Sequence, residues 1–196
     1  EAINLPAERL VTLPDAIAYE QAAAALLKGQ TTEYLLQRTY ALQAGDTCLF
    51  HAAAGGVGLL FGQWASSIGA TVIGTATTSS GADAISTALA AAGVTGAGMA
   101  LDVTTEGAVD ELVKAVTANY GAPSILVNNA GGTSRKPVIE QSERSWRRHI
   151  DLTLVSMLAA TSAAVPVVMV TSPPLPPPVP APGRIDTRPP NTGAVP

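Results

Sequence analysis

The sequence predicts an α/β fold, in which a doubly wound parallel sheet of about five strands carries helices on both faces. Three observations support this. Of the 196 residues, 47% are hydrophobic and only 13% are charged, which suits a chain with a sizeable buried core. Short apolar runs alternate with helical patterns from residue 47 onwards. The first apolar run leads into a glycine-rich turn that opens a helix.

Two helices are expected before the sheet begins. Asp15 is suited to cap a helix over residues 19–28, and Gly29 is expected to end it. Thr31 or Thr32 can then cap a second helix, because a hydroxyl oxygen accepts from the free N–H groups of a first turn.

The sheet and its helices follow in alternation. The apolar runs predict strands at residues 47–50, 70–74, 99–103, 124–127 and 165–170. Helices are predicted over residues 59–68, 82–92 and 142–163. A further helix is predicted between the third and fourth strands, with Thr104 or Thr105 as its N-terminal cap. In that further helix, one apolar stripe is formed by Val109, Leu112, Val113 and Val116.

The turn at residues 51–58 carries the strongest local signal of function. Strand, glycine turn, helix and strand form the first unit of a Rossmann-like dinucleotide-binding fold. Gly55 leaves room for a pyrophosphate to approach backbone N–H groups, and Gly58 lets the helix pack closely on the strand. The alternative is a turn that only joins two buried elements. The predicted phosphate contacts are Ala53, Gly55, Gly56, Val57 and Gly58.

Other polar loops are expected beside this turn. Ligands of such sheets bind at the carboxyl ends of the strands, which lie along one edge. The further cofactor contacts predicted at this edge are Thr75, Thr77, Thr78, Asp102, Val103, Asn128, Ala130 and Gly131.

The end of the second strand favours NADP(H) as the cofactor. A fold of this kind that prefers NAD usually places Asp or Glu there, on the ribose 2′-hydroxyl. Here the segment at residues 74–81 has hydroxyl side chains and no carboxylate, but also no Arg or Lys. The alternative is that these hydroxyls cap the following helix.

Composition excludes several classes of function. A net charge of −4 gives no general attraction to nucleic acid or to an anionic membrane. The single cysteine, Cys48, falls in a predicted buried strand, so neither a disulfide framework nor a nucleophile is expected. His51 and His149 do not have the spacing of metal ligands, so no metal site is predicted. A cytoplasmic location is expected, since no signal peptide or membrane-spanning run is seen.

Residues 5–75 resemble the medium-chain NADPH:quinone oxidoreductases of the zeta-crystallin-like type. The segments that carry the resemblance lie at residues 13–15, 21–24, 27–29, 34–36, 50–58 and 63–65. The resemblance implies cofactor contacts at Thr31 and at the glycine turn, with hydride transfer from NADPH to a quinone.

Residues 72–162 resemble a different family, the short-chain dehydrogenases/reductases, and among them the 3-oxoacyl-carrier-protein reductases. The segments concerned lie at residues 73–77, 84–86, 101–104 and 125–131, with Trp146 and residues 150–151. The resemblance implies adenine contacts at Asp102 and Val103 and a role for residues 128–131 in bracing the sheet. It also implies that a basic cluster around Arg144, Arg147 and Arg148 docks an acidic carrier; a solvated helix face is the alternative.

The catalytic residues of the short-chain family are not found. That family uses Tyr-x-x-x-Lys, but the four tyrosines are followed at the fourth position by Ala23, Arg38, Ala44 and Ser124. Thr153 stands where the family has its Asn. We therefore assign no catalytic residue, and three functions stay open. They are reduction of a quinone or conjugated carbonyl by NADPH, a non-catalytic nucleotide-binding or interaction module, and carbonyl reduction of the 3-oxoacyl type with an incomplete tetrad.

The two resemblances meet at residues 70–75, in a strand that both folds share. A recombined or engineered chimera and an imperfectly assembled sequence both account for such a join. We expect a helical lead-in at residues 1–44, a Rossmann domain at residues 45–172 and a Pro-rich tail at residues 173–196. Both resembled families form oligomers, so a homo-oligomer acting on a small-molecule quinone or carbonyl substrate is implied.

Overall fold

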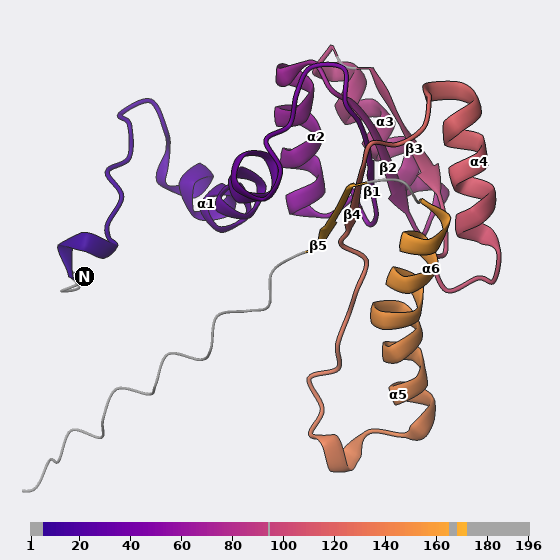
Figure 1. Cartoon of the computed structure of the whole chain (residues 1–196). Helices are drawn as coiled ribbons and strands as arrows, with labels where there is room; N and C mark the ends of the chain where they lie inside the picture. Colours follow the sequence, from indigo (N-terminus) through magenta and orange to yellow (C-terminus); the bar gives the residue numbers. More distant parts are fainter. Residues whose placement is uncertain (1–5, 94, 165–167, 172–196) are drawn as a thin grey trace, which may run out of the picture.

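A five-stranded parallel sheet lies at the centre of the chain, in the strand order β3-β2-β1-β4-β5 (Figure 1). The computed structural model describes residues 6–93, 95–164 and 168–171. The strands are β1 (Thr47–Phe50), β2 (Thr71–Ala76), β3 (Gly96–Ala100), β4 (Ile125–Asn128) and β5 (Val168–Thr171). The order reverses between β1 and β4, and a crevice at that point is where ligands bind in sheets of this kind.

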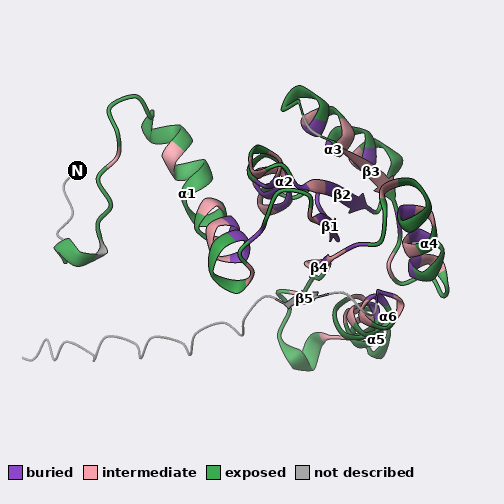
Figure 2. Cartoon of the chain, turned by 45° about the horizontal axis from the view of Figure 1, so that its top comes forward, coloured by how far each residue is buried: buried purple, intermediate pink, exposed green. Residues whose placement is uncertain are grey.

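Helices cover both faces of the sheet, so the predicted doubly wound fold is confirmed (Figure 2). On one face, Phe50 and Val72 pack with Phe61 of α2 (Gly56–Ile68) and Ile85 of α3 (Ser79–Ala91). On the other face, neighbouring strand residues pack against α4 (Ala108–Tyr120) and α6 (Ser156–Ala163). Successive strand residues point to opposite faces, which is why a continuous apolar run such as β1 feeds both cores.

The predicted helix over residues 142–163 is one continuous helical segment of three parts. It consists of α5 (Glu143–Ile150), the π-helix η4 (Asp151–Val155) and α6. Ser142 caps it, because its Oγ accepts a hydrogen bond from the N–H of Ser145 at 3.3 Å. This segment carries α5 out to the carboxyl edge of the sheet, beside the loops expected to bind a cofactor.

The prediction of two N-terminal helices separated at Gly29 is wrong. The helix α1 (Tyr19–Glu33) passes through Gly29 and continues into the π-helix η2 (Tyr34–Thr39). Glycine ends a helix when its φ is positive, but Gly29 is not among the residues with positive φ. Within a helix glycine costs only about 1 kcal/mol relative to alanine, which burial of Leu35 and Leu36 beyond it can offset.

The predicted caps in this region are also corrected. The residue before α1 is Ala18, whose N–H donates to Oε1 of Gln21, so Asp15 is not the cap. The hydroxyls of Thr31 and Thr32 donate to the carbonyls of Leu27 and Lys28, one turn earlier in the same helix. Threonine hydroxyls inside a helix make this bond instead of capping a new one.

The third strand and the helix after it begin at other residues than predicted. The strand is Gly96–Ala100 rather than residues 99–103, and a side chain at Gly98 would overlap the carbonyl of Ala82 in α3. Close approach of α3 therefore requires glycine, which hides the strand from an apolar pattern. Gly107, not Thr104 or Thr105, precedes α4, while its buried residues Val109, Leu112 and Val116 fall on the predicted stripe.

Two remaining predictions concern the C-terminal part. The fifth strand is observed at Val168–Thr171, and the Pro-rich stretch at residues 173–196 lies outside the described residues. Within the part that is described, no helix combines the length and apolar character needed to cross a membrane.

We predict opposite effects for alanine at two helical glycines. An added Cβ at Gly58 would overlap the backbone of Ala53, so Gly58→Ala is expected to lower the free energy of unfolding by about 2 kcal/mol. An added Cβ at Gly29 meets nothing within 4 Å, so Gly29→Ala should raise it by about 1 kcal/mol. Urea unfolding followed by circular dichroism measures both. Destabilisation by Gly29→Ala would show that α1 does end there.

Candidate nucleotide-binding site

Loops from four strands line a cleft of about 250 Å³ at the carboxyl edge of the sheet. The residues predicted from sequence that line it are Thr75, Thr77, Asp102, Val103, Ala130 and Gly131. Its other lining residues include Ala52 of the glycine turn and, from the long C-terminal helical segment, Arg148 and Leu152. The structure therefore brings together the loops after β1, β2, β3 and β4, as the strand-end rule predicts.

The first turn of α2 has no side-chain cap, although the Lys28 side chain lies against Gly56 within it. Gly55 precedes the helix with an extended backbone, and no side chain caps the N-terminus. The first N–H groups of a helix have no partner within the helix and carry a partial positive charge, so they suit a phosphate. A Cβ at Gly55 would lie 3.5 Å from the carbonyl oxygen of Ala52, so the turn itself tolerates one. Gly56, Val57 and Gly58 form the first turn itself.

Thr75 and Asn129 hold this turn in place. Ala52 has a φ of +56°, a left-handed conformation that costs a residue other than glycine about 1–2 kcal/mol. Its N–H donates to Oγ1 of Thr75 at 3.3 Å, and the next N–H, of Ala53, donates to the carbonyl of Thr75 at 2.8 Å. The Asn129 amide donates to the carbonyls of His51 and Ala52 at 3.2 and 3.5 Å. The neighbouring strands thus impose the conformation.

His51 is buried beneath the turn. Its side chain is only 2% exposed, and Nδ1 lies 3.1 Å from Oγ1 of Thr75. Among the described residues Nε2 has no hydrogen-bond partner. Burial lowers the pKa of His51 to about 4, so the ring is neutral at pH 7. The Thr75 hydroxyl is therefore engaged with the turn, and this residue acts on the site by positioning it.

The two threonines after β2 differ in their contacts. Oγ1 of Thr78 accepts from the N–H of Gly81 at 3.1 Å and caps α3, which is the alternative weighed for these hydroxyls. Thr77 is exposed and lines the cleft. Of the two, Thr77 is the one placed to meet a ligand there.

Asp102 follows β3 in a tight turn. Its Oδ1 accepts from the N–H and the hydroxyl of Thr104 at 2.9 and 2.6 Å. Those bonds lower the pKa of Asp102, and the charge of Arg148 lowers it further. At the end of β4, the Asn128 amide donates to Oγ1 of Thr161 at 3.4 Å, tying the strand to α6. Asn128 thus has a bracing role in this structure.

Thr31 is not brought to the cleft. It faces its own helix, whereas Lys28 and Thr32 are the residues of α1 that meet the glycine turn. The Lys28 side chain covers Gly56, and the Thr32 hydroxyl lies 3.5 Å from the carbonyl of Val57. Lys28 was not singled out from the sequence, and Arg148 was assigned to a docking cluster rather than to the cleft, because both places depend on contacts between elements far apart in the chain.

No acid–base group of the tyrosine type is present in the cleft. All four tyrosines fall in the described part of the chain, and none lines it. The Thr153 hydroxyl donates to the carbonyl of His149 within its own helix. Burial, with Asp46 nearby, raises the pKa of the Cys48 thiol to about 12, so the thiol stays protonated at neutral pH. Among the described residues, no cluster of His, Cys, Asp or Glu is suited to a metal.

The fold and this cleft define a Rossmann-type nucleotide-binding domain. The model of the short chain dehydrogenase family matches residues 47–173, and the chain belongs to this family. A short-chain dehydrogenase/reductase variant of Serratia marcescens superposes with a TM-score of 0.61 at 22% identity, over 67% of this chain and 56% of that one. L-sorbose reductase of Gluconobacter frateurii has a TM-score of 0.61 at 23% identity, over 66% and 52%.

Curated relatives confirm the composite character. The quinone oxidoreductase of Pseudomonas aeruginosa is 60% identical over 74 residues, which are 38% of this chain and 23% of that protein. The 3-oxoacyl-(acyl-carrier-protein) reductase of Vibrio cholerae is 37% identical over 121 residues, 62% of this chain and 48% of that protein. The chain thus spans about a quarter of the first relative and about half of the second.

We predict that His51 makes stability depend on pH. Its pKa is about 4 in the folded chain against an ordinary value of 6.5, so only the unfolded chain takes up this proton between those pH values. This contribution is fully present above pH 6.5 and is lost as the pH falls, by about 3 kcal/mol at pH 4. Urea unfolding at several pH values should show a flatter profile for His51→Gln. Parallel profiles for the two proteins would contradict the assignment.

Proposed function

We propose that this chain binds NADP(H) across the carboxyl edge of the sheet and serves hydride transfer to a quinone or a conjugated carbonyl. The observation that carries the proposal is the uncapped first turn of α2, which follows Ala52, a residue of the cleft wall that also contains Thr77 and Asp102. The helix N-terminus would hold the pyrophosphate, and the cleft would hold the adenosine. When bound, the nicotinamide supplies the hydride.

The preference for NADP(H) over NAD(H) rests on the end of β2. That strand ends at Ala76, and the loop after it has no carboxylate to repel a 2′-phosphate. The exposed Thr77 hydroxyl lies in the cleft wall, where it can donate to a phosphate oxygen.

A quinone fits this site better than a 3-oxoacyl substrate. Ketone reduction calls for a protein acid at the carbonyl oxygen, and no tyrosine lines the cleft. Quinone reduction depends mainly on positioning the two reactants. The 60% identity to a quinone oxidoreductase over 74 residues also supports this choice.

A second candidate is a nucleotide-binding module without catalysis. Thr153, at the position of the family's Asn, bonds within its own helix, and nothing in the cleft replaces the tyrosine. Mixing the protein with NADPH and a simple quinone separates the two candidates. Oxidation of NADPH supports the oxidoreductase, and binding without oxidation supports the module.

We predict that Gly55→Ala weakens cofactor binding without weakening the fold. The added methyl fits the free turn but occupies the approach to the open N–H groups. Loss of one or two charge-assisted hydrogen bonds should reduce NADPH affinity by about tenfold or more. Titration of NADPH and NADH followed by cofactor fluorescence measures this, with thermal unfolding as the control. An unchanged affinity, or no binding of either cofactor by the original chain, would contradict the proposal.

A further inference from the structure

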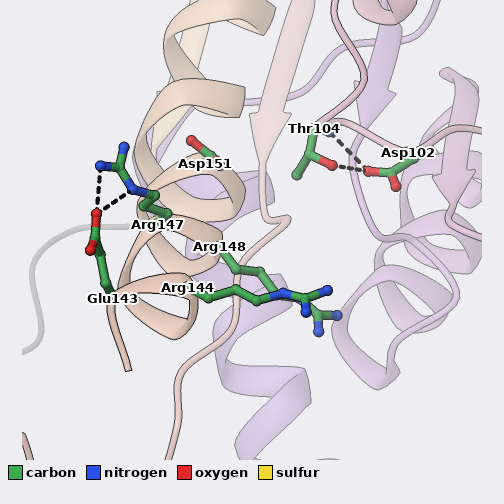
Figure 3. A pocket seen from close by; sticks show the side chains of 7 residues that line it. All are labelled: Asp102, Thr104, Glu143, Arg144, Arg147, Arg148 and Asp151. Carbon is green, nitrogen blue, oxygen red and sulfur yellow. Dashed lines mark hydrogen bonds and ion pairs between the residues drawn. The ribbon is translucent and has the colours of Figure 1, made fainter. Parts of the chain in front are cut away.

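Two arginines of α5 project together toward the cleft. Arg144 and Arg148 are one helical turn apart, are exposed, and extend side by side toward the loop of Asp102 and Thr104 (Figure 3). With that loop they line a second cavity of about 690 Å³. Arg148 also lines the 250 Å³ cleft together with Thr77, so it belongs to both spaces.

In the described part of the chain, neither of these two arginines is held in a short ion pair, although Arg148 lies near enough to Asp102 to lower the pKa of that carboxyl. Within the described residues neither forms an ion pair within 4 Å, whereas Arg147 of the same helix binds Glu143 at 2.7 Å. Like charges four residues apart destabilise a helix. An anion between the two guanidinium groups would offset that repulsion. Its oxygens would accept paired hydrogen bonds from the N–H groups of each arginine.

The neighbouring Asp102 indicates what else the ligand carries. Both hydrogen bonds from Thr104 go to Oδ1, so Oδ2 can accept from an amino group. A ligand with an anionic group for the two arginines and an exocyclic amino group for Asp102 suits this cavity. The adenosine 2′-phosphate of NADP(H) has both groups.

We propose that Arg148, assisted by Arg144, binds the 2′-phosphate of NADP(H) and sets the preference of the site for this cofactor. The inference rests on the proposed function. The segment at residues 74–81 offers hydroxyls but no cation, so the counter-ion must come from another element. Arg148 of α5 lines the same cleft as Thr77 and supplies this positive charge.

The test compares 2′,5′-ADP (adenosine 2′,5′-bisphosphate) with 5′-AMP, which differ only in the 2′-phosphate. Calorimetric titration should show that the original chain prefers 2′,5′-ADP by about tenfold or more, as charge-assisted hydrogen bonds predict. In Arg148→Ala this preference should fall to about threefold or less while binding of 5′-AMP stays unchanged. Arg148→Lys should retain part of it. Arg147→Ala is the matched control, since Arg147 is paired with Glu143, and it should keep the full preference.

The outcomes separate the two proposals. If Arg148→Ala keeps the preference, or loses affinity equally for both nucleotides, the role of Arg148 is wrong and the nucleotide site stands. If the original chain binds both nucleotides equally, the site does not recognise the 2′-phosphate and the proposed role of Arg148 is wrong. If it binds neither, the proposed function fails and this inference fails with it. Circular dichroism of each variant confirms that the fold is unchanged.

Discussion

The hydrogen bonds between Thr75 and the glycine turn are the contacts on which the site depends. The Thr75 hydroxyl accepts a hydrogen bond from the N–H of Ala52 and is hydrogen-bonded to Nδ1 of His51. The carbonyl of Thr75 accepts a hydrogen bond from the N–H of Ala53. These bonds hold Ala52 in a left-handed conformation, which aims the open turn of α2 at the sheet edge. Thr75 also lies at residues 70–75, where the two family resemblances meet. The glycine turn, which resembles the quinone oxidoreductases, is therefore held by the strand at which the resemblance to the short-chain dehydrogenases begins.

Two sources of positive charge therefore flank the site. The N-terminus of α2 provides a partial positive charge on one side, and Arg148 on α5 provides a full one on the other. The chain as a whole has a net charge of −4, so this concentration of positive potential at the cleft is local. Such a local positive potential is the feature on which the proposed binding of an anionic nucleotide depends.

Local sequence features predicted those parts of the structure that local contacts determine. β1 is observed at the predicted residues 47–50, because its apolar run is bounded by a turn on each side. The close packing of Gly58 was also predicted. Gly29 was misjudged because burial of Leu35 and Leu36 outweighs a weak local preference. A bracing role for residues 128–131 was expected, but the contact of Asn129 with the glycine turn and the place of Arg148 in the cleft wall were not, since each depends on a segment far away in sequence.

In the proposed complex, one dinucleotide spans the glycine turn and the cleft after β3. Hydrogen exchange of the backbone amides, with and without NADPH, tests it most directly. We expect NADPH to slow the exchange of the backbone amides at residues 55–58 and at residues 102–104 together, with little change along α1. Protection confined to one of the two segments, or found along α1 instead, would contradict it.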